Sequence, residues 1–385
     1  MRKVVLILCC LVLIGSLAEA KTVKKAPRAP QQKVYGSLPM PPLQPVGALS
    51  LQSNPSLTPP GITPQEQRLY VSEENQPVQV GGLIYFRYQK YLQNGTVPSN
   101  FDVDRVYLDF KKIIDRRSAV RVTFDVGRLD ASIDPNKKSQ QLFDFLKYAY
   151  AELAVNSSAA LKIGLQQTAW IDWEDKVLGL RYIAKTILDN EGIMPSADFG
   201  VGAVGTITSP GGGAVEYQAT LMNGTGYRLA ENDNKKNAAL RMNATLFEND
   251  QLGSIIAGAF GQLKGISSAQ LAGDSKLAGA LLGWKTTRSV IYGELIRGAG
   301  ISAYSFGAKY SFLPGWGLFG RHDNYDPNIN SETTEIQRNF YGVTYDYSNN
   351  IKFALDVQTV LGGPQATVSP NATTSAVYLH CMTAF

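Results

Sequence analysis

The chain alternates hydrophobic and polar side chains with a period of two residues, most clearly between Glu335 and Val360. From residue 341 to 347 the odd positions carry tyrosine or valine, while the even positions carry glycine, threonine and aspartate. After a predicted tight turn at residues 348–350, a second segment alternates in the same way up to residue 358. Successive side chains of a β-strand point to opposite faces, so this pattern predicts a hairpin with one apolar and one polar face.

The same alternating unit recurs about sixteen times between residue 78 and Phe385. Short predicted turns alternate with mostly longer connections, and the short ones lie at residues 115–117, 156–158, 210–212, 248–250, 286–288, 313–315 and 348–350. Short turns on one side and long loops on the other are typical of membrane barrels, in which the short turns face the periplasm. We therefore predict an all-β fold, a transmembrane antiparallel β-barrel of about 16 strands, over residues 78–385.

The apolar faces of the predicted strands fit a barrel in lipid. Lipid offers no hydrogen bonds, so a β-structure in the bilayer must close on itself, and its polar faces then line a wet lumen. No proline falls within a predicted strand interior, as a closed ladder requires. After the first twenty residues, no segment approaches the ~20 consecutive apolar residues of a membrane helix. An exported soluble all-β protein is the alternative fold.

Residues 1–20 have the features of an export signal, because Arg2 and Lys3 precede an apolar run from Val4 to Leu17, and Ala18-Glu19-Ala20 follows as a cleavage site. If this signal is removed, Cys381 is the only remaining cysteine, so no disulfide within the chain is expected. An export signal followed by a barrel pattern predicts location in the bacterial outer membrane.

Residues 21–77 are interpreted as a Pro-rich, basic periplasmic tail or linker. Ten of the nineteen prolines and five Lys or Arg residues, but no Asp or Glu, fall within residues 21–65. This composition predicts a spacer without a core, and its basic start is also compatible with a periplasmic partner or lipid headgroups. The rest of the mature chain has nearly equal numbers of basic and acidic residues, so no nucleic-acid partner is indicated.

Three short motifs resemble the phosphate-selective porin family, which comprises porins O and P. They are residues 104–110 (DRVYLDF), 221–227 (LMNGTGY) and 318–328 (LFGRHDNYDPN), and they fall in the family's order. The resemblance implies a sixteen-stranded trimeric porin whose third external loop folds into the lumen. It also implies a phosphate preference that depends on pore arginines and on lysines at the constriction. This chain has no lysine cluster at its long loop, and its tail lies outside the match.

The alternation is interrupted over about residues 167–195, in the third long connection counted from the first predicted strand. Hydrophobic residues recur there at helical spacing, namely Trp173, Val177, Leu180, Ala184 and Ile187. A helix packed on the barrel wall is therefore predicted. Glu174, Arg181 and Lys185 fall together at one edge of that helix and would form a charged constriction. The alternative is a plugging or structural helix with internal ion pairs.

Basic side chains at inward-facing strand positions are predicted to line the lumen, namely Arg105, Arg121, Lys162, Arg241 and Arg321. Acidic residues such as Asp109, Asp125 and Asp356 share the inward face. A wall of mixed charge sets up a transverse field and gives modest ion selectivity.

Enzymatic signals are weak. His322 and His380 are the only histidines, which excludes a histidine cluster for metal, and one mature cysteine leaves no thiolate metal site. No cofactor and no metal are predicted.

The sequence thus predicts a non-enzymatic porin, a water-filled channel for passive diffusion of small hydrophilic solutes or ions that leans toward anions such as phosphate. Expected partners are the solutes, outer-membrane lipid and further copies of the chain in a homotrimer. The alternative function is a structural sleeve that holds a partner, such as an electron-transfer cytochrome, across the outer membrane. A sleeve would need contacts to that partner in place of an inward loop.

Overall fold

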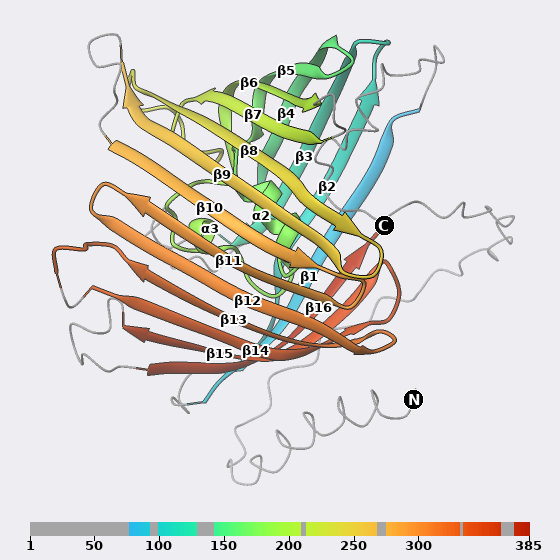
Figure 1. Ribbon diagram of the computed structural model, residues 1–385, viewed down its shortest axis with the longest axis vertical. Coiled ribbons are helices and arrows are strands. Elements are labelled where there is room, and N and C mark those ends of the chain that lie inside the picture. Colours follow the sequence, from blue (N-terminus) through green and yellow to red (C-terminus); the bar gives the residue numbers. More distant parts are fainter. Residues whose placement is uncertain are drawn as a thin grey trace, which may run out of the picture. The chain divides into compact units, whose positions relative to one another are not determined.

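A computed structural model describes residues 77–92, 99–128, 142–208, 213–267, 275–331, 334–362 and 373–385. Within these ranges the chain forms a closed barrel in which each strand pairs with its neighbours in sequence and β1 pairs with β16 (Figure 1). All sixteen pairings are antiparallel, so the predicted all-β barrel and its strand number are confirmed. The expected signal at residues 1–20, nearly all of the tail at 21–77 and the turn at 210–212 lie outside the described residues.

The strands in chain order are β1 (Gln79–Tyr91), β2 (Asn100–Ile113), β3 (Ser118–Arg128), β4 (Leu142–Asn156), β5 (Ala159–Gln167), β6 (Ala197–Thr208), β7 (Ala214–Met222), β8 (Lys236–Asn249), β9 (Gly253–Ile266), β10 (Ser275–Lys285), β11 (Ser289–Gly298), β12 (Ile301–Leu313), β13 (Trp316–Asp326), β14 (Ile336–Asp346), β15 (Ile351–Gly362) and β16 (Thr373–Ala384). Two short helices, α2 (Ile171–Leu178) and α3 (Ile187–Asn190), lie between β5 and β6. Neither of these described helices is long and apolar enough to cross a membrane.

The barrel closes where the end of the chain meets its first strand. The backbone N–H of Gly82 donates to the carbonyl oxygen of Phe385 at 3.0 Å, and the Phe385 N–H donates to the Gly82 carbonyl at 3.1 Å. A Cβ atom at position 82 would lie 2.3 Å from the Phe385 ring, so a larger residue there would displace this aromatic side chain. The last residue of the chain therefore completes the ladder across the seam.

Exposed hydrophobic side chains recur around the outer surface of the barrel. Examples are Phe124 on β3, Val201 on β6, Leu282 on β10 and Phe306 on β12. Near the short turn after β10, the Trp284 indole is exposed and its Nε1 donates to the Leu252 carbonyl at 2.7 Å. An apolar outer band with an amphipathic aromatic residue near its edge is the surface that a membrane barrel presents to lipid.

Strand β4 departs from simple alternation at Lys147. Thr123 of β3 pairs with Tyr148, whereas Phe124 pairs with Leu146, so Lys147 is an extra residue in β4. Such a β-bulge lets two consecutive side chains point to the same side. Lys147 and Tyr148 are both buried, and both contact residues inside the barrel.

The single long helix expected in the third long connection is wrong. Helix α2 ends at Leu178, because Gly179 follows in the left-handed conformation with φ 65° and its N–H bonds back to the Asp175 carbonyl. This is a common helix stop, and glycine adopts it without steric cost. Glu174, Arg181 and Lys185 consequently do not share one helix edge.

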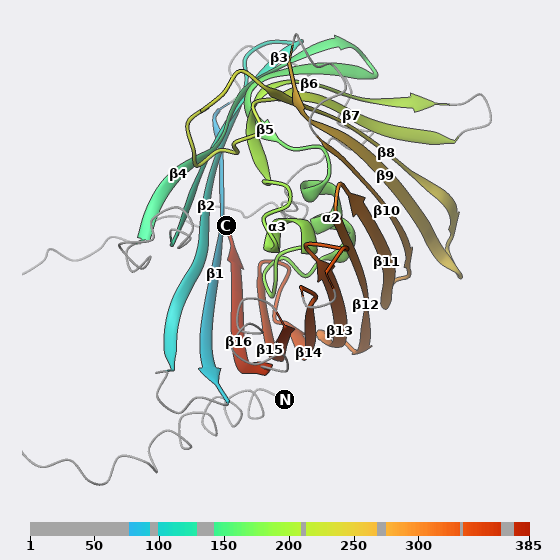
Figure 2. The same cartoon turned by 90° about the vertical axis from the view of Figure 1, so that its left-hand side faces the viewer.

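The connection between β5 and β6, which we call the inner loop (residues 168–196), lies inside the barrel (Figure 2). One hydrophobic cluster joins Trp170, Trp173 and Leu188 of the loop to Phe260 and Ile296 of the wall. A second cluster joins Leu180 and Ile183 to wall residues on β1, β13, β14 and β15. Two of the three hydrophobic clusters of the described residues therefore lie where the inner loop contacts the wall, because burial there removes apolar side chains of both partners from water.

Candidate constriction of the lumen

The first anchor of the inner loop is the indole pair of Trp170 and Trp173. Gly258 of β9 leaves the space for Trp173, because a Cβ atom there would lie 2.2 Å from the indole. The Trp170 Nε1 donates to Glu294 Oε1 on β11 at 2.8 Å. Shape and one buried hydrogen bond thus fix α2 against the wall.

Glu174 is fully buried at this anchor and lies beside Glu294. Burial and the neighbouring carboxylate raise the pKa of Glu174 well above its usual range, because both penalise its charged form. Glu174 therefore contacts the wall at Glu294, and its buried carboxyl group does not face water in the lumen.

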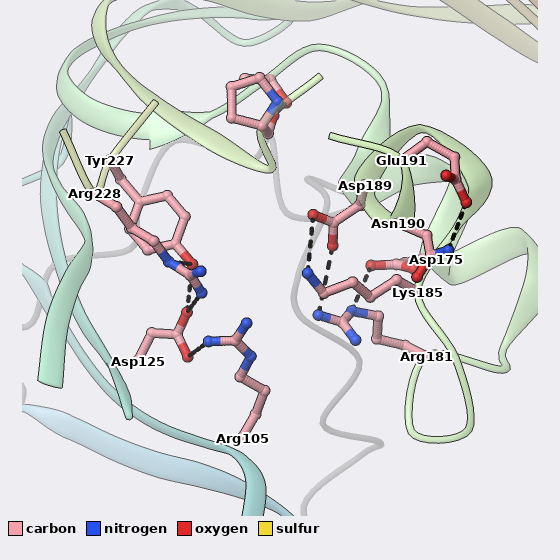
Figure 3. A network of polar contacts seen from close by, with 12 residues as sticks. Arg105, Asp125, Asp175, Arg181, Lys185, Asp189, Asn190, Glu191, Tyr227 and Arg228 are labelled. Atoms are coloured by element: carbon pink, nitrogen blue, oxygen red, sulfur yellow. Dashed lines mark hydrogen bonds and ion pairs between the residues drawn. The ribbon is translucent and has the colours of Figure 1, made fainter. Parts of the chain in front are cut away.

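Past α2, the inner loop carries a compact charged group. The Arg181 Nε lies 3.4 Å from Asp175 Oδ2, and its Nη2 lies 3.6 Å from Asp189 Oδ2. The Lys185 ammonium is 3.7 Å from Asp189 Oδ1. Arg181 and Lys185 are thus brought together, as the sequence suggested, but by a shared carboxylate rather than by a helix face (Figure 3).

A second charged group lies opposite, on the barrel wall (Figure 3). Asp125 of β3 accepts a hydrogen bond from the Tyr227 hydroxyl at 2.6 Å. The Arg105 Nη1 lies 3.5 Å from the same carboxylate and the Arg228 Nη2 lies 3.7 Å from it. Arg105 comes from β2, whereas Tyr227 and Arg228 come from the connection between β7 and β8. Strands and a second loop therefore converge on one buried carboxylate.

The two groups are close enough to act on each other electrostatically. Burial lowers the pKa of Lys185, Asp189 opposes this effect, and Arg105 and Arg228 of the wall add to it. Burial would raise the pKa of Asp189, but Lys185 and Arg181 outweigh it and lower that pKa, and Lys147 and Arg105 contribute. The loop and wall groups thus form one candidate constriction.

The candidate constriction has an excess of positive charge. Its basic members are Arg105, Lys147, Arg181, Lys185 and Arg228, and its acidic members are Asp125, Asp175 and Asp189. Aromatic rings position part of this positive charge, since the Lys147 ammonium lies 4.4 Å from the Tyr107 ring centroid. A ring positions a cation without neutralising it, whereas a carboxylate cancels its charge.

The other basic residues predicted to line the lumen each contact a carboxylate or a backbone carbonyl inside the barrel. Arg121 pairs with Asp109 at 2.7 Å, and Lys162 lies 3.7 Å from Glu152. The Arg241 Nη1 donates to the Ala169 carbonyl of the inner loop at 3.0 Å. Arg321 is buried against Asp323. These residues support the wall and the loop, apart from the constriction itself.

Sequence reasoning missed Lys147, Tyr227 and Arg228. Strict alternation places Lys147 on the lipid side, and only the β-bulge reverses it. Tyr227 and Arg228 follow a strand end, where alternation carries no information. Their one signal was the resemblance at residues 221–227, which includes Tyr227. No group of three metal-ligating side chains occurs in the described part of the chain.

No protein-family model matches the chain, and no curated protein matches it. Solved structures of bacterial outer-membrane porins do match it. OprB of Pseudomonas putida at high pH has a TM-score of 0.59 at 8% identity, over 80% of this chain and 94% of that one. Salmonella typhi OmpF, in complex with daunomycin, has a TM-score of 0.56 at 10% identity, over 82% and 99%. The anion-selective porin from Comamonas acidovorans has a TM-score of 0.54 at 11% identity, over 80% and 99%.

This chain therefore has the fold of the bacterial outer-membrane porins, a closed sixteen-stranded antiparallel barrel. The similarity concerns the fold alone, since so few residues are identical.

Proposed function

We propose that this protein is a porin of the bacterial outer membrane, which lets small hydrophilic solutes diffuse passively and favours anions. The observation that carries the proposal is the inner loop, which lies inside a closed barrel and faces charged wall residues across the lumen. A field at such a site acts on every passing ion, whereas charges on a wide wall are dispersed by water and salt. The excess of basic over acidic side chains sets the expected preference for anions.

The alternative sleeve function is less well supported. A sleeve needs its inner wall free for a partner, yet the inner loop already packs against β9–β15 through two hydrophobic clusters. Purification of the protein with bound haem would favour the sleeve, and conductance of the protein alone favours the channel.

Substitution Lys185→Glu tests the channel. Lys185 keeps 29% of its side chain exposed, more than Arg181 or Asp189, so the change alters charge with little loss of packing. In planar bilayers with a KCl gradient, the chloride-to-potassium permeability ratio should fall roughly two- to fivefold. Arg116→Glu makes the same charge change in the exposed turn after β2 and should leave the ratio unchanged. Equal permeability ratios in the two variants would show that the candidate constriction lies outside the conduction path.

Four finer hypotheses remain predictions. A phosphate preference and membership of the phosphate-selective family have the three sequence motifs as support. The homotrimer is tested by the mobility of unheated samples on a gel. The possible periplasmic partner of the tail is supported by the basic residues at its start. Deleting residues 26–65 tests a structural role of the tail, and barrel assembly and single-channel conductance should stay intact.

A further inference from the structure

The Tyr107 hydroxyl joins the two sides of the candidate constriction. On the wall side, the Lys147 ammonium donates to its oxygen at 3.3 Å. On the loop side, the Arg181 Nη2 donates to the same oxygen at 3.4 Å. Tyr107 lies on β2, Lys147 on the bulge of β4 and Arg181 on the inner loop. Three separate elements therefore bring their polar atoms to one point.

The two cationic donors decide where the Tyr107 hydrogen points. A phenol oxygen has two acceptor positions and one hydrogen to donate. With both acceptor positions taken by cations, the O–H must point away from them, and within the described residues no oxygen accepts it. Two cations at its oxygen also make this hydroxyl a stronger donor, because they withdraw electron density from it.

The ring of Tyr107 is held so that the hydroxyl keeps this position. Tyr85 contacts it edge-on, with ring centroids 6.0 Å apart, and the Lys147 ammonium lies 4.4 Å from its centroid. Two other tyrosine hydroxyls at the constriction are already committed, since Tyr148 donates to Asp172 and Tyr227 donates to Asp125. Tyr107 as a residue is partly exposed, although protein groups closely surround its hydroxyl.

We propose that Tyr107, Lys147 and Arg181 form a transient binding site for a small oxyanion, such as a carboxylate, on its way through the lumen. The site rests on the proposed channel function. An oxyanion offers several acceptor positions to three donors of fixed direction, whereas chloride offers one centre with no preferred geometry. The neighbouring carboxylates Asp175 and Asp189 keep the binding weak, which a channel needs because a bound solute must also leave.

Conductance in solutions of increasing sodium acetate concentration tests the site. A channel with a binding site saturates, so single-channel conductance should level off in acetate. Tyr107→Phe keeps the ring and removes the hydroxyl, and should raise the half-saturating acetate concentration roughly two- to tenfold, the range for one hydrogen bond. Conductance in sodium chloride should change less. A parallel series in sodium phosphate distinguishes carboxylate from phosphate by the lower half-saturating concentration.

Tyr150→Phe is the matched control, since Tyr150 also holds a cation over its ring, Lys162 at 5.0 Å, but lies outside the constriction. This variant should behave as the wild type. Lys147→Met is a second variant that removes charge while filling the same space, and it should weaken acetate saturation in the same direction as Tyr107→Phe. The site is overturned if acetate conductance does not saturate, or if Tyr107→Phe and Tyr150→Phe are equivalent. A wild-type protein without conductance in either salt would instead overturn the channel, and the site with it.

Discussion

Two opposed effects act on the pKa of Asp175, which belongs to the charged group of the inner loop. Burial in the inner loop raises the pKa of its carboxyl to about 7, although Arg181, 3.4 Å away, lowers it. Asp189 and Asp172 add to the rise because like charges disfavour ionisation. The carboxyl therefore gains a proton, and the constriction loses a negative charge, as the pH falls through 7.

We expect the preference for anions to rise as the pH is lowered from 8 to 6. Lys176, whose pKa burial lowers to about 8, gains charge over part of the same interval and acts in the same direction. Asp175→Asn fixes the neutral form, so at pH 8 it should resemble the wild type at pH 6, and it should lose most of its pH dependence. Reversal potentials across the pH series measure this, and an unaltered pH dependence in the variant would contradict it.

Residue-scale prediction from sequence succeeded where alternation alone decides direction. Arg121 lies on a regular stretch of β3, where its parity points into the barrel, and Arg105 keeps its inward direction although the register between β1 and β2 shifts beside it. Lys147 could not be placed, because a β-bulge depends on how two strands pair and leaves no local pattern. Glu174 was misplaced because its partner, Glu294, lies in a strand far along the chain.

At the scale of elements, one substitution on β9 should displace helix α2 from the barrel wall. Gly258→Val would displace the indole of Trp173, since a Cβ atom at position 258 would lie 2.2 Å from that ring. Such overpacking typically costs about 1–3 kcal/mol. The inner loop should shift, with higher conductance and a weaker anion preference. Gly261→Val on the same strand meets no atom within 4 Å and should conduct as the wild type.

The strands were predictable because alternation is written locally in each of them. The break in the predicted inner helix was not predictable, because Leu180 of the periodic set is buried as expected but in a second cluster. Helical spacing shows only which residues are apolar, not whether one helix carries them all. Here Gly179 ends α2, and the residues before and after it pack in two separate clusters.

For the whole molecule, the seam between β1 and β16 is the point where closure is decided. Gly82→Val would place atoms against the Phe385 ring, whereas Gly320→Val on β13 meets Tyr341 only at 3.6 Å, an ordinary contact. We expect the first variant to lower the temperature at which the folded band on a gel disappears, and the second to leave it unchanged. Equal melting of both would show that the terminal aromatic contact does not stabilise closure.

Strand number and antiparallel order at this scale followed from counting alternating units and turns. The part of the wall that the inner loop covers could not be predicted from the sequence. It depends on inward-facing apolar residues of strands that are distant in sequence, such as Phe260, Leu281 and Phe319. These residues alternate like any others, and only their shared neighbourhood distinguishes them.

The inner loop also imposes an order in time. Its contacts reach forward along the chain, since Trp170 bonds to Glu294 across 124 residues and Arg338 bonds to Glu191 across 147 residues. The loop cannot settle until β11 and β14 have been added, and contacts between such distant residues form slowly. An assembly intermediate that lacks β11 and β14 would therefore lack the anchored inner loop, so the proposed preference for anions would arise only after these strands have paired.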